Sequence, residues 1–261
     1  MLFLLSPAKS LDFSTPTPPE IDRLATEPAF VPQSTRLIGL LRRRSPASIA
    51  ALMGLSPTLA RLNVDRYAAW SANFTADNSK PAVLAFDGDV YGGFGAKSLG
   101  VADLAWAQQH IAILSGLHGV LRPLDRLQPY RLEMGTRLTN PRGKDLYAFW
   151  GETIAEHLNV RAATHTSPVV VNLASQEYFK AANRRPVLMP RVIDCVFEEW
   201  HKGRYQIISF FAKRARGLMA RHAVLGRHAT PAGLESFDAE GYRFEPGASS
   251  RGTLVFRRRA G

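Results

Sequence analysis

Residues 115–135, SGLHGVLRPLDRLQPYRLEMG, form the stretch around which the rest of the chain is organised. It interleaves apolar residues with five charged ones, Arg122, Asp125, Arg126, Arg131 and Glu133. Pro123 and Pro129 each remove a backbone donor, so neither an uninterrupted helix nor a central strand fits the whole stretch. We expect its charges to be paired or to face a bound anion. The alternative is a surface crossover whose arginines close local salt bridges.

The composition is that of a globular protein with an excess of positive charge. A chain of 261 residues suits one large domain or two small ones, with a substantial core. The formal net charge of +11 favours an anionic partner such as nucleic acid, a phosphate ligand or an anionic membrane. Residues 201–261 hold 12 Lys and Arg against 4 Asp and Glu, so we expect a positive patch there.

Cysteine and histidine usage excludes several classes of site. The single cysteine, Cys195, excludes an internal disulfide framework and is typical of the reducing cytosol. The seven histidines show no metal-ligand spacing, so we expect no metal and no cofactor. The apolar run at residues 1–5 is too short for a signal peptide, and no run reaches transmembrane length. We therefore expect a cytoplasmic protein with no membrane partner.

Four short apolar runs, at residues 3–5, 82–86, 169–171 and 207–211, each end in polar and charged side chains. Such runs are typical of buried strands. We expect a single mixed α/β domain over residues 1–261, with a largely parallel central sheet flanked by helices. In such sheets a ligand crevice lies beyond the carboxyl ends of the strands. The alternative is that polar residues simply follow each strand where it ends.

Helical spacing of apolar residues predicts helices over 101–119, 145–159 and 215–225, the second with Asp145 as its N-cap. At the carboxyl end we expect a β-hairpin in which residues 242–244 pair with 253–256.

Two Ser-Pro pairs, Ser45-Pro46 and Ser56-Pro57, predict consecutive helix starts within an element at about 45–70. Residues 52–60, LMGLSPTLA, resemble the hairpin of helix-hairpin-helix DNA-binding motifs, whose pattern is apolar-x-Gly-apolar-Gly-Pro-x-x-Ala. The second helix of that motif offers free amides to a backbone phosphate. The candidate DNA-binding residues are Gly54, Leu55, Ser56, Pro57, Thr58, Leu59 and Arg61. Ser56 replaces a glycine of the pattern, and a simple helical hairpin is the alternative.

The remaining candidates are cations, carboxylates and polar groups near predicted strand ends, since no Walker A loop, dinucleotide fingerprint or nucleophile elbow is present. They are Lys9, Arg122, Asp125, Tyr130, Arg131, Glu133, Asn172, Ser175, Glu177, Tyr178, Lys213 and Arg216. We expect the cations to form an anion cradle whose geometry the glutamates fix, with the tyrosines stacking on a base or sugar. The alternative is a structural ion-pair network. No residue is assigned a catalytic role.

Motifs over nearly the whole chain resemble the YaaA family of bacterial peroxide stress proteins. They are SPAK (6–9), DGDVY (87–91), LSGL (114–117), VLRPLD (120–125), QPYRLEMG (128–135), GKDLY (143–147), NLAS (172–175), EYFK (177–180) and ARGLM (215–219). The resemblance implies a mixed α/β fold of its own type and DNA binding through the helix-hairpin-helix element. It also implies protection of DNA and a limit on free iron under peroxide, but no established reaction.

Two functional hypotheses follow. The first is a stress protein that contacts phosphates of double-stranded DNA, without reading sequence, through residues 45–70 and the basic last quarter. The second is an enzyme acting on a nucleobase, nucleotide or related small anionic ligand at the strand ends. Because no ligand cluster for iron is visible, we expect any effect on iron to be indirect.

Overall fold

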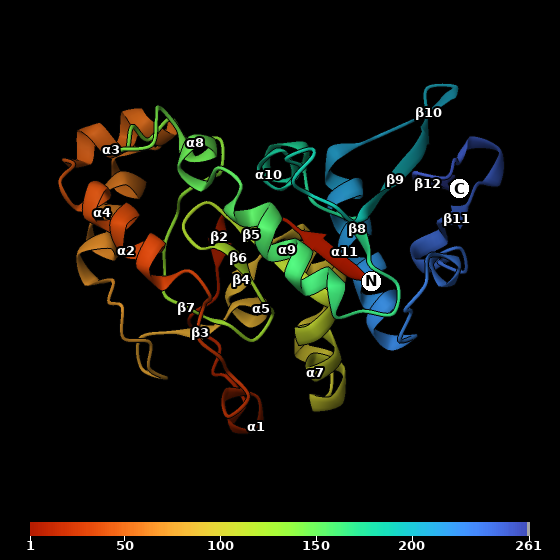
Figure 1. Ribbon diagram of the computed structural model, residues 1–261, viewed down its shortest axis with the longest axis horizontal. Helices are drawn as coiled ribbons and strands as arrows, with labels where there is room; N and C mark the ends of the chain where they lie inside the picture. The colour runs from red at the N-terminus through yellow and green to blue at the C-terminus, as the bar shows by residue number, and fades with distance from the viewer. Residues whose placement is uncertain (260–261) are drawn as a thin grey trace.

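Leu2–Leu5 form strand β1 at the middle of the sheet in the computed structural model (Figure 1). All four side chains are buried, as expected of a strand that is covered on both faces. β1 pairs in parallel with β5 (Ile111–Ser115) on one side and β8 (Val169–Asn172) on the other. The structure describes residues 1–259, so the last two residues of the predicted domain lie outside the described part.

The main sheet has the strand order β11-β12-β9-β8-β1-β5-β6, with β10 beside β9. Its four inner pairs, β12–β9, β9–β8, β8–β1 and β1–β5, are parallel. The largely parallel central sheet is therefore confirmed. The remaining strands of this sheet are β6 (Gly119–Leu121), β9 (Arg191–His201), β10 (Arg204–Gln206), β11 (Arg243–Phe244) and β12 (Thr253–Arg258). Two small sheets pair β2 (Ser10–Leu11) with β4 (Phe86–Asp87), and β3 (Lys80–Pro81) with β7 (Arg126–Leu127).

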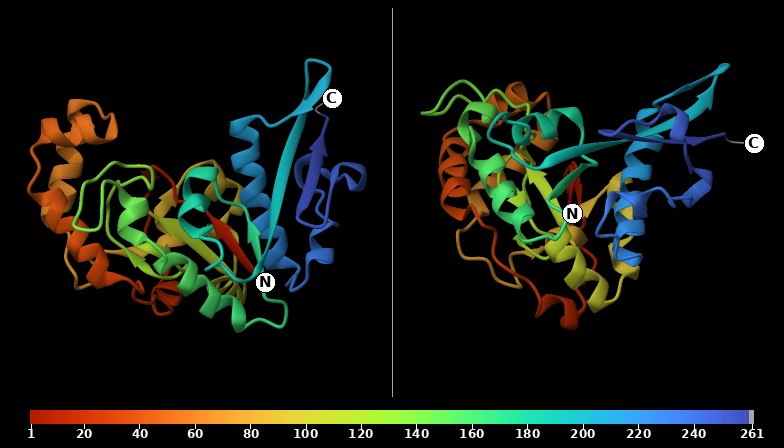
Figure 2. Two further views of the ribbon diagram at one scale, coloured as in Figure 1. Left: turned by 45° about the horizontal axis from the view of Figure 1, so that its top comes forward. Right: turned by 45° about the vertical axis from the view of Figure 1, so that its right-hand side comes forward.

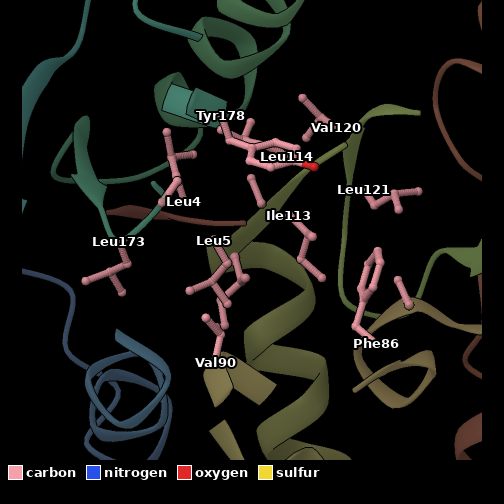
Figure 3. Close-up of a cluster of buried hydrophobic side chains, with 14 of the residues drawn as sticks. Leu4, Leu5, Phe86, Val90, Ile113, Leu114, Val120, Leu121, Leu173 and Tyr178 are labelled. Carbon is pink, nitrogen blue, oxygen red and sulfur yellow. The ribbon is translucent and has the colours of Figure 1, made fainter. Parts of the chain in front are cut away.

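Helices flank the sheet on both faces. They are α1 (Pro19–Asp22), α2 (Val31–Arg42), α3 (Pro46–Met53), α4 (Pro57–Ala69), α5 (Ala82–Ala85), α6 (Asp89–Phe94), α7 (Val101–His110), α8 (Leu146–Trp150), α9 (Thr153–Ala163), α10 (Gln176–Ala182) and α11 (Ser209–Leu225). Figure 3 shows Leu4 and Tyr178 of α10 on one side of β1, and Leu5 and Val90 of α6 on the other. No helix of the described chain is both long and apolar enough to cross a bilayer.

Helices α6 and α11 pack unusually closely, because glycines meet at their contact. A Cβ added at Gly217 would lie 1.8 Å from the carbonyl oxygen of Val90, and one at Gly93 would lie 2.3 Å from that of Arg214. Backbone therefore touches backbone here, which only glycine allows. The contact brings the first half of α11 beside residues 87–91, which line the candidate site described below.

Two of the four predicted strands are wrong. Residues 82–85 form α5, and only the last residue of the run, Phe86, enters a strand, β4, outside the main sheet. The run 207–211 lies mostly in the first turn of α11. The strand of this region, β10, ends just before the run. It follows β9 after a tight turn in which Lys202 and Gly203 have positive φ. Short apolar runs fit a helix or a strand equally well, so their neighbours decide.

The missing strand lies inside the predicted 101–119 helix, which ends at His110, and residues 111–115 form β5. Ile111 and Ile113 favour this extended conformation because they are β-branched. Asp145 is an N-cap as predicted, since its Oδ1 accepts the Ala148 amide at 2.8 Å. The predicted 145–159 helix is nevertheless two helices, α8 and α9, with Gly151 at a φ of 51° between them. Near the carboxyl end, β11 pairs antiparallel with β12, which is also paired in parallel with β9.

Candidate functional site

A cavity of about 400 Å³ lies beyond the carboxyl ends of β1 and β8. Five segments meet there: the loop after β1, the start of α6, residues 130–133, the start of α10 and the first half of α11. The lining residues are Ser6, Pro7, Ala8, Lys9, Ser10, Asp87, Gly88, Asp89, Val90, Tyr91, Tyr130, Arg131, Leu132, Glu133, Ser175, Glu177, Tyr178, Lys213 and Arg216. The volume is in the range of small-molecule sites, and the position is the one that parallel sheets favour for a ligand.

The cavity gathers nine of the twelve residues predicted for a pocket. They are Lys9, Tyr130, Arg131, Glu133, Ser175, Glu177, Tyr178, Lys213 and Arg216. Arg122, Asp125 and Asn172 are not among its lining residues. These three make contacts that hold the fold together.

Asp125 is the buried centre of a structural network. Its carboxylate accepts hydrogen bonds from the Arg122 amide at 2.8 Å, from Arg122 Nε at 3.0 Å and from Thr26 Oγ1 at 2.6 Å. Burial raises the pKa of Asp125, and these hydrogen bonds oppose the rise. Arg122 and Asp125 thus close a turn between β6 and β7 and link it to residue 26. For this pair, the interpretation as a local salt bridge fits the geometry.

Asn172 lies at the end of β8 and points along the sheet. Its Nδ2 donates to Asp194 Oδ1 at 2.7 Å, and its Oδ1 accepts the Ala174 amide at 3.0 Å. The side chain therefore ties β8 to β9 and shapes the turn that leads into α10. It supports the cavity wall without lining it.

Polar lining residues that the sequence did not predict include Ser6, Asp87, Asp89 and Tyr91. Ser6 Oγ accepts the Ser175 amide at 2.8 Å, which joins the loops after β1 and β8. Tyr91 donates from its hydroxyl to the carbonyl oxygen of Ser6 at 3.0 Å. A signal was present, because these four residues belong to the SPAK and DGDVY motifs that follow two of the apolar runs.

Charges in the cavity are balanced. Glu133 accepts from Arg131 Nη2 at 2.9 Å and forms an ion pair with Lys9 at 3.2 Å. Glu177 Oε1 accepts the Gly135 amide at 2.8 Å. Within residues 1–259, Lys213 and Arg216 form no ion pair, and burial lowers the pKa of the Arg216 guanidinium. These two cations are therefore available to a ligand.

Burial raises the pKa of all three lining tyrosines, Tyr91, Tyr130 and Tyr178, so each phenol is uncharged at neutral pH. Tyr130 and Ser115 share a hydrogen bond of 2.7 Å between their oxygens. The rings offer flat apolar surface, and their hydroxyls serve as hydrogen-bond groups and not as bases.

The cavity lining contains four cations and four carboxylates, because Asp87 and Asp89 join the two glutamates that were expected beside the cations. Such a mixture complements a ligand that carries both an anionic group and hydrogen-bond donors. Within the described residues, no group of three or more His, Cys, Asp or Glu side chains is placed to hold a metal ion.

The candidate DNA-binding residues lie on a second feature, the turn between α3 and α4. Ser45 caps α3 by accepting the Ser48 amide at 3.2 Å, and Ser56 caps α4 by accepting the Leu59 amide at 3.4 Å. Gly54 has a φ of 62°, a left-handed conformation that favours glycine. Gly54, Ser56, Pro57, Thr58, Leu59 and Arg61 are exposed and Leu55 is half-buried. The turn is open to solvent.

The surroundings of this turn are basic. Residues 31–70 contain six arginines and one acidic residue, Asp65. Arg43 and Arg61 are exposed, whereas Arg42 is engaged with the end of α4, where its Nε donates to the Tyr67 carbonyl oxygen at 2.8 Å. The Tyr67 hydroxyl in turn donates to the carbonyl oxygen of Arg131. Because Arg131 lines the cavity, α4 is anchored to the cavity wall.

The fold and the cavity define a class: an α/β protein with a largely parallel sheet and a charged cavity beyond the carboxyl ends of its strands. A family model described as "Peroxide stress protein YaaA" matches residues 1–248, so the chain belongs to the YaaA family. This confirms the resemblance found in the sequence.

Relatives named "UPF0246 protein" cover the whole chain. That of Albidiferax ferrireducens is 61% identical over 258 residues, or 99% of this chain and 98% of the relative. That of Paracidovorax citrulli is 61% identical over 259 residues, or 99% of each chain. That of Bordetella petrii is 60% identical over 260 residues, or 100% of each chain.

Proposed function

We propose that the chain is a DNA-binding protein of the peroxide stress response, whose α3–α4 hairpin acts as a helix-hairpin-helix element on duplex phosphates. The single observation that carries this proposal is the exposed, basic start of α4. Within residues 1–259 the Thr58 amide has no acceptor, and the positive end of the helix dipole lies beside it. A phosphate oxygen is the natural partner of such a helix start.

Charge supports the same assignment. Arg61 follows the exposed amide by one helical turn, and Arg43 lies exposed at the carboxyl end of α2. Contacts of this kind position a protein on the sugar–phosphate backbone without reading bases, so the binding is not sequence-specific. The net charge of +11 adds long-range attraction to DNA at low ionic strength.

The test places a negative charge where the phosphate is proposed to bind. Thr58→Asp adds a carboxylate to the first turn of α4. A negative charge there interacts favourably with the helix dipole, so the fold should be preserved. We expect it to weaken binding to a labelled duplex by about tenfold or more, because like charges repel across the contact. Fluorescence anisotropy measures the affinity, and urea unfolding checks stability.

The matched control is Ala102→Asp. Ala102 is an exposed residue at the same position of the first turn of α7, which lies far from α3 and α4 (Figure 1). It changes the net charge by the same amount, so it should alter duplex affinity much less. Equal losses in the two variants would mean that net charge alone attracts DNA, and the hairpin would lose its assigned role.

A second candidate function is binding or turnover of a nucleobase, nucleotide or related small anion in the cavity. The observation that favours it is the pair of cations, Lys213 and Arg216, that have no ion-pair partner within residues 1–259 and face a cavity of about 400 Å³. Arg216→Gln should abolish binding of a nucleoside monophosphate in calorimetry and leave duplex affinity unchanged. Arg122 is unsuitable for this test because it belongs to the Asp125 network.

The limit on free iron that the family resemblance implies remains a separate prediction. It is tested by measuring loosely bound iron in peroxide-treated cells with and without the chain. DNA breaks counted in the same cells, and in cells carrying Thr58→Asp, distinguish protection by DNA binding from an effect on iron.

A further inference from the structure

The first turn of α11 and the short segment just before it carry exposed apolar side chains beside a cation. Ile207, Phe210 and Phe211 are 58%, 57% and 38% exposed, and Lys213 is exposed one turn later. We call these four residues the α11 rim. In the left view of Figure 2, the start of α11 lies apart from the α3–α4 hairpin, with other segments of the chain between them. The rim is therefore a surface separate from the proposed duplex contact.

The segment that holds the rim is purely basic. Residues 200–217 contain five cations and no carboxylate: Lys202, Arg204, Lys213, Arg214 and Arg216. Arg214 is paired with Glu240 at 2.5 Å. Within residues 1–259 the other four form no ion pair. An exposed apolar surface embedded in unpaired positive charge is complementary to a partner that is both aromatic and anionic.

Neighbouring aromatic rings show how this surface is organised. Trp200, Tyr205 and Phe211 each lie under an arginine, at 4.3, 4.5 and 4.8 Å from the guanidinium carbon to the ring centre. Phe210 has no such cover within residues 1–259 and touches Phe211 edge-on, with ring centres 5.6 Å apart. Its ring is therefore the accessible flat surface of the segment.

The rim adjoins the cavity. Lys213 follows Phe210 by three residues on α11, so the two side chains are neighbours on the helix surface. Lys213 also lines the cavity. A group stacked on Phe210 would thus lie at the cavity entrance, within reach of the same lysine.

We propose that the α11 rim binds unpaired nucleotides of a nucleic acid strand, with one base stacked on Phe210 and an adjacent phosphate held by Lys213. Stacking on an aromatic ring needs a base whose face is open, which a base inside a duplex does not offer. The inference deepens the proposed function, because it adds a second, single-strand contact to the duplex contact of the α3–α4 hairpin.

Two other occupants fit the rim less well. A membrane-binding face would be continuously apolar, whereas here Lys213 lies within one turn of Phe210 and beside a charged cavity. A second copy of this chain would bring its own five cations of residues 200–217 against the first copy's. Both occupants are included as outcomes of the test.

The experiment measures binding of a short labelled oligothymidylate and of a blunt duplex by fluorescence anisotropy. Phe210→Ala should weaken oligothymidylate binding by about tenfold and change duplex binding by less than about twofold. Phe210→Trp should retain or strengthen the binding to the single strand. Lys213→Gln should lower the salt slope for the oligothymidylate by about 0.7. Leu225→Ala is the control, since Leu225 is 53% exposed at the other end of α11 and should change neither.

The outcomes separate this inference from the proposed function. Binding of oligothymidylate that depends on Phe210, with or without duplex binding, supports the rim. Duplex binding that Thr58→Asp removes, with no single-strand binding, leaves the proposed function standing and overturns the rim. Equal affinities of Phe210→Ala and Leu225→Ala for the single strand would likewise overturn the proposal for the rim. Two further outcomes would overturn the proposal for the rim. In each, Phe210→Ala leaves the oligothymidylate affinity unchanged. The variant instead loses binding to anionic phospholipid vesicles, or loses self-association in sedimentation.

Discussion

The α3–α4 turn and the strand-end cavity are both rich in charge, but they use it differently. At the turn, Thr58 and Arg61 face solvent, and Asp65 is the one acidic residue in the forty residues around them. In the cavity, four cations are set among four carboxylates, and Arg131 and Lys9 are already paired with Glu133. An open basic turn suits a polyanion of any sequence, whereas a balanced cavity suits a small ligand of defined shape.

The largest effect on stability is expected at the backbone contact between α6 and α11, two helices whose residues line the cavity. Gly217→Val would drive its side chain into the Val90 carbonyl oxygen, which lies 1.8 Å from the position of an added Cβ. We expect a loss of about 3 kcal/mol in the free energy of unfolding, measured with urea. Gly39→Ala is the control, because an added Cβ there meets nothing within 4 Å and alanine favours the helix. Similar stabilities for the two variants would mean that α6 and α11 are not tightly packed.

A second effect is a pH dependence of the free energy of unfolding, which arises at His118 beside the cavity wall and not at the α3–α4 turn. His118 packs beside Tyr130, and burial lowers the pKa of His118 to about 3. The unfolded chain takes up a proton near pH 6.5 and the folded chain does not, so stability falls as the pH drops below 6.5. By pH 5 the buried, uncharged His118 should have lowered the free energy of unfolding by about 2 kcal/mol.

His118→Gln removes that dependence. The difference in unfolding free energy between wild type and this variant should therefore shrink by about 2 kcal/mol from pH 7.5 to pH 5. A difference that stays constant over this range would show that His118 titrates normally in the folded protein.

The smallest effect concerns the capping serine of the turn. Ser56→Gly removes the hydroxyl that accepts the Leu59 amide and restores the second glycine of the helix-hairpin-helix pattern. Stability should fall by a few tenths of a kcal/mol, roughly the cost of a serine-to-glycine change at an N-cap. Duplex affinity should rise by about threefold, because a second amide becomes free for phosphate. A tenfold fall in affinity would instead show that the hydroxyl itself binds the phosphate.

Local rules predicted those parts of the fold that local interactions determine. The Ser-Pro pairs mark the starts of α3 and α4, and Asp145 marks the start of α8. The buried runs at β1 and β8 were visible because a strand covered on both faces is apolar at every position. The segment 111–115 escaped notice because its periodicity continues that of the helix before it. Its pairing with β1 on one side and β6 on the other makes it a strand.

The candidate site shows the same division. Arg122 with Asp125 and Arg131 with Glu133 look alike in sequence, since each is a close pair of opposite charges in one stretch. The chain path buries Asp125 at 1% exposure and turns Glu133 toward the cavity. That difference arises from long-range packing, through Thr26 in one case and α4 in the other. Sequence spacing cannot distinguish the two pairs.

The most direct test of the account is the salt dependence of duplex binding by wild type and by Arg61→Gln. We predict a steep linear fall of log affinity with log salt, and a slope that is smaller by about 0.9 in the variant, because one phosphate contact is lost. Urea unfolding should be unchanged, since Arg61 is exposed. A flat salt dependence, or the same slope in both proteins, would contradict the assignment of the α3–α4 turn to DNA.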